Sequence, residues 1–185
     1  MRSRNIADIP TTKECYEILE ETGTLQHIKE HSITVTCVAK EIAEHLNQAG
    51  KKVDAELIVA AALLHDVTKT RSLETGEDHT ETGAELLRQK GYFEISEIVR
   101  QHVRLDYEPS NEKITEAEIV NYADKRVINR GVVSLQERRE YIFRRYAGHY
   151  IDASVLEKIW GDTEKIETKI FAEMPYGPEK LADKI

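Results

Sequence analysis

Residues 55–70 read AELIVAAALLHDVTKT, and this stretch decides how the rest of the chain is interpreted. Its segment 57–64 is apolar on every side, which is typical of a helix buried at the centre of a helical protein. We expect Asp54 to cap this helix, which would cover about 55–65. His65 and Asp66 then stand at its buried end, where ionisable groups are costly unless a partner satisfies them. The polar segment 67–78 is predicted to be a loop.

Amphipathic patterns flank the central helix on both sides. Apolar residues recur there at steps of three and four, which predicts helices, and strong helix formers dominate a composition with only four prolines. The predicted fold class is therefore all-α, and a length of 185 residues predicts a single domain. Besides 55–65, helices are expected over about 12–22, 25–48, 79–90, 93–104, 116–129, 134–147 and 152–173, between a loose arm (1–10) and an irregular tail (174–185).

Charge and composition exclude several classes of protein. A net charge of −8 and a pI near 5.5 argue against an extended nucleic-acid surface, although a nucleotide ligand is compatible with them. The longest apolar run, 57–64, is too short to span a membrane, and the N-terminal stretch lacks the apolar region of a signal peptide. Cys15 and Cys37 do not make a disulfide framework, so the expected location is the cytoplasm.

Further polar residues occupy positions where the helical periodicity calls for apolar ones. His31 and Asp124 each lie three or four residues from the apolar positions on either side, His102 falls on the apolar stripe of its helix, and His79 lies in a first helical turn. A single buried histidine is more often a core residue with one hydrogen bond, and Asp124 could pair with Lys125 or an arginine. Several such residues on separate helices are better explained by one shared site. The candidate metal ligands are His31, His65, Asp66, His79, His102 and Asp124.

The donor set narrows the metal and the number of ions. Imidazole and carboxylate ligands without thiolate suit Fe, Mn, Mg, Co or Zn in an open site. Six protein ligands are too many for one catalytic metal, whereas two ions roughly 3.5–4 Å apart would use them all. Asp66 is the best candidate to bridge the two ions because a carboxylate has two oxygens.

The other histidines and basic residues receive less specific interpretations. Residues 27–31 read HIKEH, so they do not match the HExxH zinc motif. Lys69 follows His65 and Asp66 closely and could hold a substrate phosphate. Surface or ordinary packing roles are expected for His27, His45 and His149, and a solvated helical face for Lys125, Arg126, Arg130, Arg138, Arg139, Arg144 and Arg145.

The pattern His31, His65-Asp66, Asp124 resembles the signature of the HD superfamily of metal-dependent phosphohydrolases. The segment ALLHDVTKT (62–70) resembles its HD motif with a trailing lysine, and HTETGAELL (79–87) and IVRQHV (98–103) resemble the additional histidine segments of its binuclear members. The resemblance covers about 25–130 and implies an all-α HD-domain helical bundle. It further implies that His31, His65, Asp66 and Asp124 hold one divalent metal, while His79 and His102 join Asp66 around a second.

The same resemblance implies hydrolysis of a phosphate ester or anhydride, most closely like bacterial HD proteins that split dinucleoside polyphosphates. Asp66 and Lys69 are the candidate catalytic residues, with Asp66 orienting the nucleophile and Lys69 neutralising the phosphate of a small substrate, expected to be a nucleotide. Three alternatives stay open: a mononuclear nucleotidase, a non-catalytic nucleotide-binding regulatory module, and a helical scaffold without metal. The charged helices over about 134–173 are additions to the HD core and candidates for a homodimer contact.

Overall fold

The computed structural model describes residues 9–110, 113–146 and 152–185, and helices form most of this part of the chain. The predicted all-α fold class is therefore confirmed. The two short strands are β1 (Val127–Ile128) and β2 (Gly131–Val132), and a 3-10 helix covers Pro178–Lys184. The α-helices are α1 (Thr12–Glu21), α2 (Gln26–Gln48), α3 (Ala55–Leu64), α4 (Lys69–Thr75), α5 (His79–Gln89), α6 (Phe93–Arg100), α7 (Glu116–Lys125), α8 (Leu135–Tyr146) and α9 (Ala153–Phe171).

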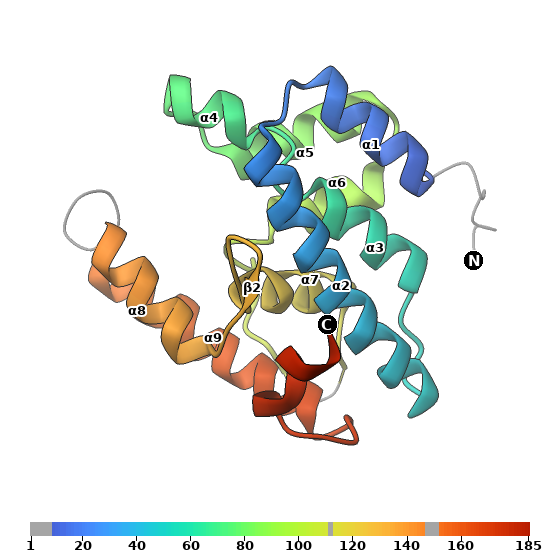
Figure 1. Ribbon diagram of the computed structural model, residues 1–185, viewed down its shortest axis with the longest axis vertical. Helices are drawn as coiled ribbons and strands as arrows, with labels where there is room; N and C mark the ends of the chain where they lie inside the picture. Colours follow the sequence, from blue (N-terminus) through green and yellow to red (C-terminus); the bar gives the residue numbers. More distant parts are fainter. Residues whose placement is uncertain (1–8, 111–112, 147–151) are drawn as a thin grey trace.

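Helix α3 lies at the centre of the fold, as its uniformly apolar sequence predicts. The side chain of Asp54 caps it by accepting a hydrogen bond from the backbone N–H of Leu57 at 2.9 Å. The helix contacts α1, α2, α6 and α7, and the long helix α2 runs beside both α3 and α7 (Figure 1). Because neighbours surround α3, its C-terminal end delivers the next residues into the interior of the protein rather than to its surface.

The C-terminal helices pack against the rest of the helical bundle through α7. The side chains of Trp160, Ile166 and Ile170 on α9 are buried, and Lys169 Nζ donates a hydrogen bond of 2.6 Å to the buried carboxylate of Glu118 on α7. Figure 1 shows α8 and α9, coloured orange to red, on the side of α7 away from α1 and α4. Among the helices of the described ranges, none combines the length and apolar character that crossing a membrane would require.

Two predicted boundaries around the HD motif and the last aspartate are wrong. The predicted loop 67–78 contains α4, which ends where Gly76 adopts a left-handed φ of 74°. The helix predicted over 116–129 ends at Lys125 and gives way to the antiparallel pair β1 and β2. The β-branched residues Val127 and Ile128 favour this strand, and Asn129 has a φ of 55°, which a helix interior does not accommodate.

The prediction of a solvated basic face is wrong for Lys125 and Arg126, which are only 5% and 3% exposed. Lys125 Nζ donates hydrogen bonds of 3.1 Å to the carbonyl oxygens of His102 and Val103. Arg126 forms an ion pair with Glu167 on α9, at 3.3 Å. The other helices of the bundle cover one face of α7 and α9 covers the other, so both faces are buried.

Candidate metal centre

Five helices or helix ends bring the six predicted ligands together. His31 lies within α2, His79 begins α5, and Asp124 lies in the last turn of α7. His65 is the C-cap residue of α3, with Asp66 directly after it, whereas His102 follows the end of α6. The helix predicted over 93–104 is therefore shorter than expected, and the turn after it carries the histidine. All six residues face one cluster, and His149 lies outside the described residues.

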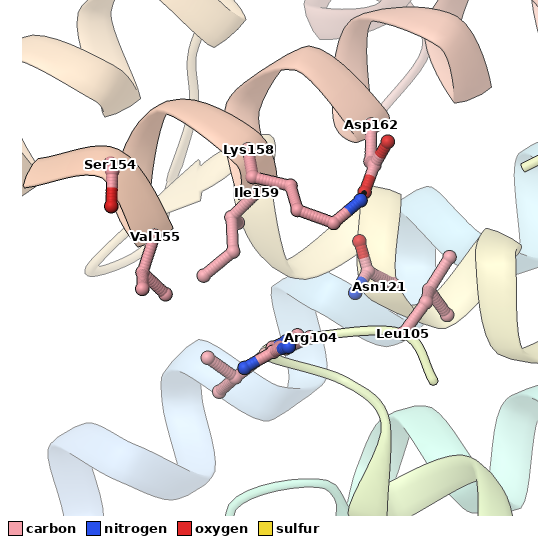
Figure 2. Close-up of a pocket in the computed structure, with 9 residues that line it drawn as sticks. Arg104, Leu105, Asn121, Ser154, Val155, Lys158, Ile159 and Asp162 are labelled. Carbon is pink, nitrogen blue, oxygen red and sulfur yellow. Dashed lines mark hydrogen bonds and ion pairs between the residues drawn. The ribbon is translucent and has the colours of Figure 1, made fainter. Parts of the chain in front are cut away.

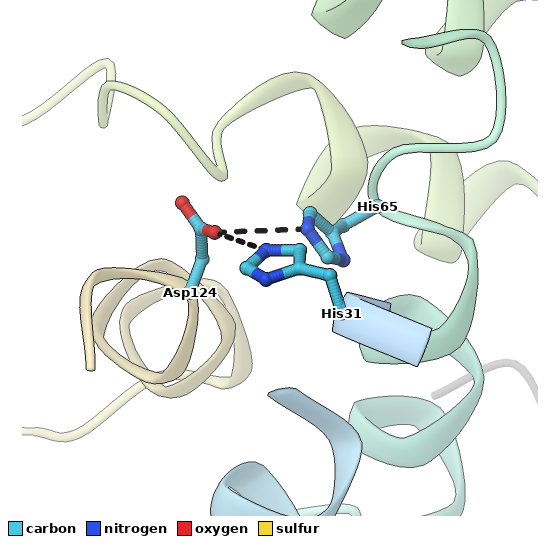
Figure 3. Close-up of side chains that lie close together, drawn as sticks. All are labelled: His31, His65 and Asp124. Carbon is cyan, nitrogen blue, oxygen red and sulfur yellow. Dashed lines mark hydrogen bonds and ion pairs between the residues drawn. The ribbon is translucent and has the colours of Figure 1, made fainter. Parts of the chain in front are cut away.

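One half of the cluster consists of His31, His65 and Asp124 (Figure 3). Asp124 Oδ1 lies 3.0 Å from His31 Nε2 and 3.7 Å from His65 Nε2. His65 Nδ1 donates to the carbonyl oxygen of Ala62 at 2.8 Å, and His31 Nδ1 donates to that of Asn129 at 3.2 Å. These outer hydrogen bonds fix the two rings so that each Nε2 faces the cluster, the arrangement commonly seen for metal-ligating histidines.

The other half gathers His79 and His102 around Asp66. Asp66 Oδ1 lies 3.2 Å from His79 Nε2 and 3.5 Å from His102 Nε2, and the two Nε2 atoms are 3.3 Å apart. His102 Nδ1 donates to the carbonyl oxygen of Val99 at 2.6 Å, which again points Nε2 inward. Lys69, in the first turn of α4, places its Nζ 3.1 Å from His79 Nε2. Lys69 therefore lies at the edge of this half of the cluster. It belongs to helix α4, whereas the sequence predicted a loop there.

Asp66 and His65 connect the two halves. Asp66 Oδ2 lies 3.6 Å from His65 Nε2, while Oδ1 faces the other half. Both Asp66 Oδ1 and His65 Nε2 are buried and accept no hydrogen bond from the described residues. Ligand atoms of His65, Asp66 and His102 also lie within 4.8 Å of one another. Buried lone pairs converging in this way fit a divalent cation, which would satisfy them together.

The protonation states of His65 and the two aspartates also suit metal binding. Burial lowers the pKa of His65 to about 4, so its imidazole is neutral at pH 7. Burial by itself raises the pKa of Asp66, but the neighbouring imidazoles and Lys69 outweigh it and hold that pKa well below its usual range. The pKa of Asp124 is likewise lowered, because the hydrogen bond from His31 and the charge of a nearby arginine outweigh burial. Neutral imidazoles and carboxylates are the forms that bind metals.

Close packing holds the His79 half in place. Thr68 donates a hydrogen bond of 3.0 Å to the carbonyl oxygen of His79, and its hydroxyl lies 2.9 Å from that of Thr82. A Cβ at Gly83 would lie 3.3 Å from the side chain of Val99, so the absence of a side chain there allows α5 and α6 to approach closely. Gly83, four residues after His79, thus has a packing role.

Sequence reasoning missed Arg138 on α8. It was assigned to a solvated face, yet its side chain is 14% exposed and its Nη2 lies 3.5 Å from Asp124 Oδ1. A signal was present, because Arg138 lies three residues after the buried Leu135 and four before the half-buried Ile142. That is the same interruption of an apolar stripe that identified His31.

A pocket of about 160 Å³ lies between α9 and the segment that follows His102 (Figure 2). Figure 2 shows Lys158 of α9 extending toward Asp162, with Arg104 on the opposite wall. A wider hollow of about 570 Å³ shares Arg104 and Lys158 and reaches the residues on either side of His79. Neither hollow is lined by the six candidate ligands, but the smaller one includes the residue that follows His102 and the larger one includes both sequence neighbours of His79. The smaller pocket is lined by Val103, Arg104, Leu105, Asn121, Ser154, Val155, Lys158, Ile159 and Asp162.

Fold and site together define a helical protein whose buried histidines and aspartates could hold divalent cations. The HD domain family model matches residues 28–127, and the chain belongs to this family. A crystal structure of a predicted HD superfamily hydrolase from an uncultured Thermotogales bacterium has a similar fold. The TM-score is 0.50 at 23% sequence identity, covering 90% of this chain and 92% of that chain.

Curated relatives match part of the chain. An uncharacterized protein of Methanocaldococcus jannaschii is 34% identical over 79 residues, which are 42% of this chain and 46% of that protein. A dihydroneopterin 2′,3′-cyclic phosphate phosphodiesterase of the same organism is 34% identical over 110 residues, which are 52% of this chain and 44% of that enzyme. The chain thus spans less than half the length of these relatives.

Proposed function

We propose that this protein is a metal-dependent phosphohydrolase acting on a nucleotide or a related phosphate ester or anhydride. The observation that carries the proposal is a pair of buried ligand atoms, His65 Nε2 and Asp66 Oδ1, at the junction of two donor groups. Neither atom has a hydrogen-bond partner among the described residues. Family membership supports it, as does the relative named as a cyclic phosphate phosphodiesterase. In this proposal residues 1–185 form one domain, with α8 and α9 added to the HD core.

The proposed ligands divide along the two halves of the cluster. His31, His65, Asp66 and Asp124 would hold one divalent ion, and Asp66, His79 and His102 a second. When bound, such ions polarise a phosphoryl oxygen and lower the pKa of a coordinated water toward 7. The placement of Asp66 Oδ2 toward His65 and of Oδ1 toward His79 favours the two-metal form over the mononuclear alternative.

Asp66 and Lys69 have distinct proposed roles in the reaction. The carboxylate of Asp66 is held ionised, so it can accept a hydrogen bond from the attacking water and orient that water's oxygen toward phosphorus. Lys69 Nζ is half-buried beside His79 and can donate to a phosphoryl oxygen as negative charge develops there. The leaving portion of the substrate could extend into the hollow bordered by Arg104 and Lys158.

The test combines elemental analysis with a substrate screen. The purified chain is loaded with Mn²⁺ or Fe²⁺, its metals per chain are counted, and products are followed by chromatography with nucleotides, cyclic nucleotides and dinucleoside polyphosphates. We expect two metals per chain and hydrolysis that falls more than about 100-fold in Asp66→Ala. Asp183→Asn, an exposed carboxylate in the C-terminal 3-10 helix, is the matched control.

The remaining outcomes separate the alternatives. One metal per chain with full activity would favour the mononuclear nucleotidase. Tight nucleotide binding without turnover would favour the regulatory module, and a metal-free protein whose melting temperature ignores chelators would favour the scaffold. An Asp66→Ala protein that keeps its metals and its full activity would refute the proposed role of Asp66.

A further inference from the structure

Arg138 is a half-buried cation at the candidate metal centre that lies outside the residues matched by the family model. The family model ends at residue 127, whereas Arg138 lies on α8. The contact with Asp124 therefore comes from a helix that follows the matched residues. Nothing in the proposed metal chemistry explains why a guanidinium should be brought there.

The hydrogen bonding of this guanidinium is incomplete. Its Nη2 lies 3.5 Å from Asp124 Oδ1, which is longer than an ordinary charge-assisted hydrogen bond. Its Nε is buried and has no hydrogen-bond partner among the described residues. The guanidinium carbon lies 5.7 Å from the centre of the Tyr141 ring, which helps to fix the side chain. Burying a cationic N–H donor without an acceptor costs free energy. An anion that accepted a hydrogen bond from this donor would remove that cost.

Arg139, the next residue on α8, forms an ion pair with a carboxylate at ordinary hydrogen-bond distances. Arg139 Nη2 donates to both carboxylate oxygens of Glu157 on α9, at 2.8 and 2.7 Å. Among the described residues Arg138 has no comparable carboxylate, because the oxygen of Asp124 nearest to it already lies 3.0 Å from His31. Arg138 is therefore held at the site with donors left over.

We propose that Arg138 binds the phosphoryl group of the substrate at the His31, His65 and Asp124 half of the centre. This inference rests on the proposed phosphohydrolase function and adds a substrate-binding residue to it. The fork of N–H donors in a guanidinium matches two oxygens of a phosphate, which a lysine cannot do in the same way. Lys69 contacts the His79 half and Arg138 the Asp124 half, so each half has one cation for a phosphoryl oxygen.

The competing role for Arg138 is to orient Asp124 as a metal ligand. The two roles differ in what the loss of Arg138 changes. A residue that binds the substrate affects the affinity for phosphate and leaves the metal content unchanged, whereas a positioning residue lowers the affinity for the metal itself.

The experiment measures the binding of inorganic phosphate to the Mn²⁺-loaded full chain by calorimetry, together with manganese content. We expect Arg138→Gln to weaken phosphate binding by about 10- to 100-fold, the range for a lost hydrogen bond to a charged group, with manganese content unchanged. Arg139→Gln, on the same helix but paired with Glu157, should bind phosphate like the wild type. Arg138→Lys keeps the charge without the fork and should also bind more weakly, so it serves if Arg138→Gln does not fold.

Three results would overturn the inference. They are a wild-type protein that binds no phosphate when loaded, unchanged phosphate affinity in the folded Arg138 variants, and a loss of manganese that parallels the loss of phosphate. The measurement needs no turnover, so it separates the two proposals. A loaded protein that binds phosphate through Arg138 but hydrolyses no phosphate compound would refute the proposed function and leave the binding site standing.

Discussion

The pH dependence of stability in the metal-free protein should report directly on the burial of His65. Burial lowers the pKa of this histidine from 6.5 to about 4. As the pH falls below 6.5, the unfolded chain takes up a proton at His65 that the folded protein does not, so stability decreases with decreasing pH. At ~1.4 kcal/mol per pH unit, the difference between 6.5 and about 4 corresponds to a loss of about 3 kcal/mol by pH 4.

Other site residues act in different pH windows. For His31, burial lowers the pKa, but the hydrogen bond with Asp124 outweighs it and the pKa is raised, so its stabilising effect is lost as the pH rises through a value above 6.5. The pKa values of Asp66 and Asp124 are lowered, and the stability they contribute is lost below about 3.8. The range between pH 4 and 6.5 therefore isolates His65 among these four residues.

The assay is urea unfolding of the chelator-treated protein at pH values from 4 to 7.5, in the wild type and in His65→Leu. We expect the free energy of unfolding of the wild type to fall by about 3 kcal/mol relative to that of the variant across this range. Two parallel curves would mean that His65 titrates as it does in the unfolded chain. That result would refute the account of a buried, neutral imidazole prepared for metal.

Three further predictions concern ligand binding and packing. Adding Mn²⁺ at 100 times its dissociation constant should stabilise the wild type by about 2.7 kcal/mol in thermal unfolding, and a melting temperature that ignores the metal would contradict the site. Lys169→Met should cost about 3–5 kcal/mol in urea unfolding because it leaves the carboxylate of Glu118, 1% exposed, without its cationic partner; a change below 1 kcal/mol would contradict that burial. Gly83→Ala should lower the melting temperature because its Cβ meets Val99 at 3.3 Å, whereas Gly161→Ala, with open space in α9, should raise stability by about 0.5–1 kcal/mol; the same sign for both variants would contradict the packing.

The cluster could be predicted because its members are polar residues at positions where the local sequence pattern calls for apolar ones. His31, His102 and Asp124 stand on helix faces that periodicity assigns to the interior, and His65 and Asp66 end the most apolar helix. Those are properties of each segment alone, and a polar residue on a buried stripe is costly wherever the segment packs. The convergence of these residues could be inferred because one shared ligand removes several such costs together.

Other features depended on contacts between distant segments. Lys125 and Arg126 were expected on a solvated face, because an amphipathic pattern indicates that one side of a helix is buried. The packing of α9 against α7 buries the second side as well. The hairpin of β1 and β2 interrupts a pattern that could equally continue a helix, yet its turn supplies the Asn129 carbonyl that orients His31.

By itself the sequence determined the all-helical class, the central position of α3 and the set of residues brought together around Asp66. Hydrophobic periodicity and the cost of burying polar groups are encoded locally, which is why they can be read along the chain. Only the tertiary structure decided the distances between the side chains of these six residues and that Arg138 reaches Asp124. Distances between side chains on separate helices are fixed by how the helices pack, and residue spacing along one segment does not contain that information.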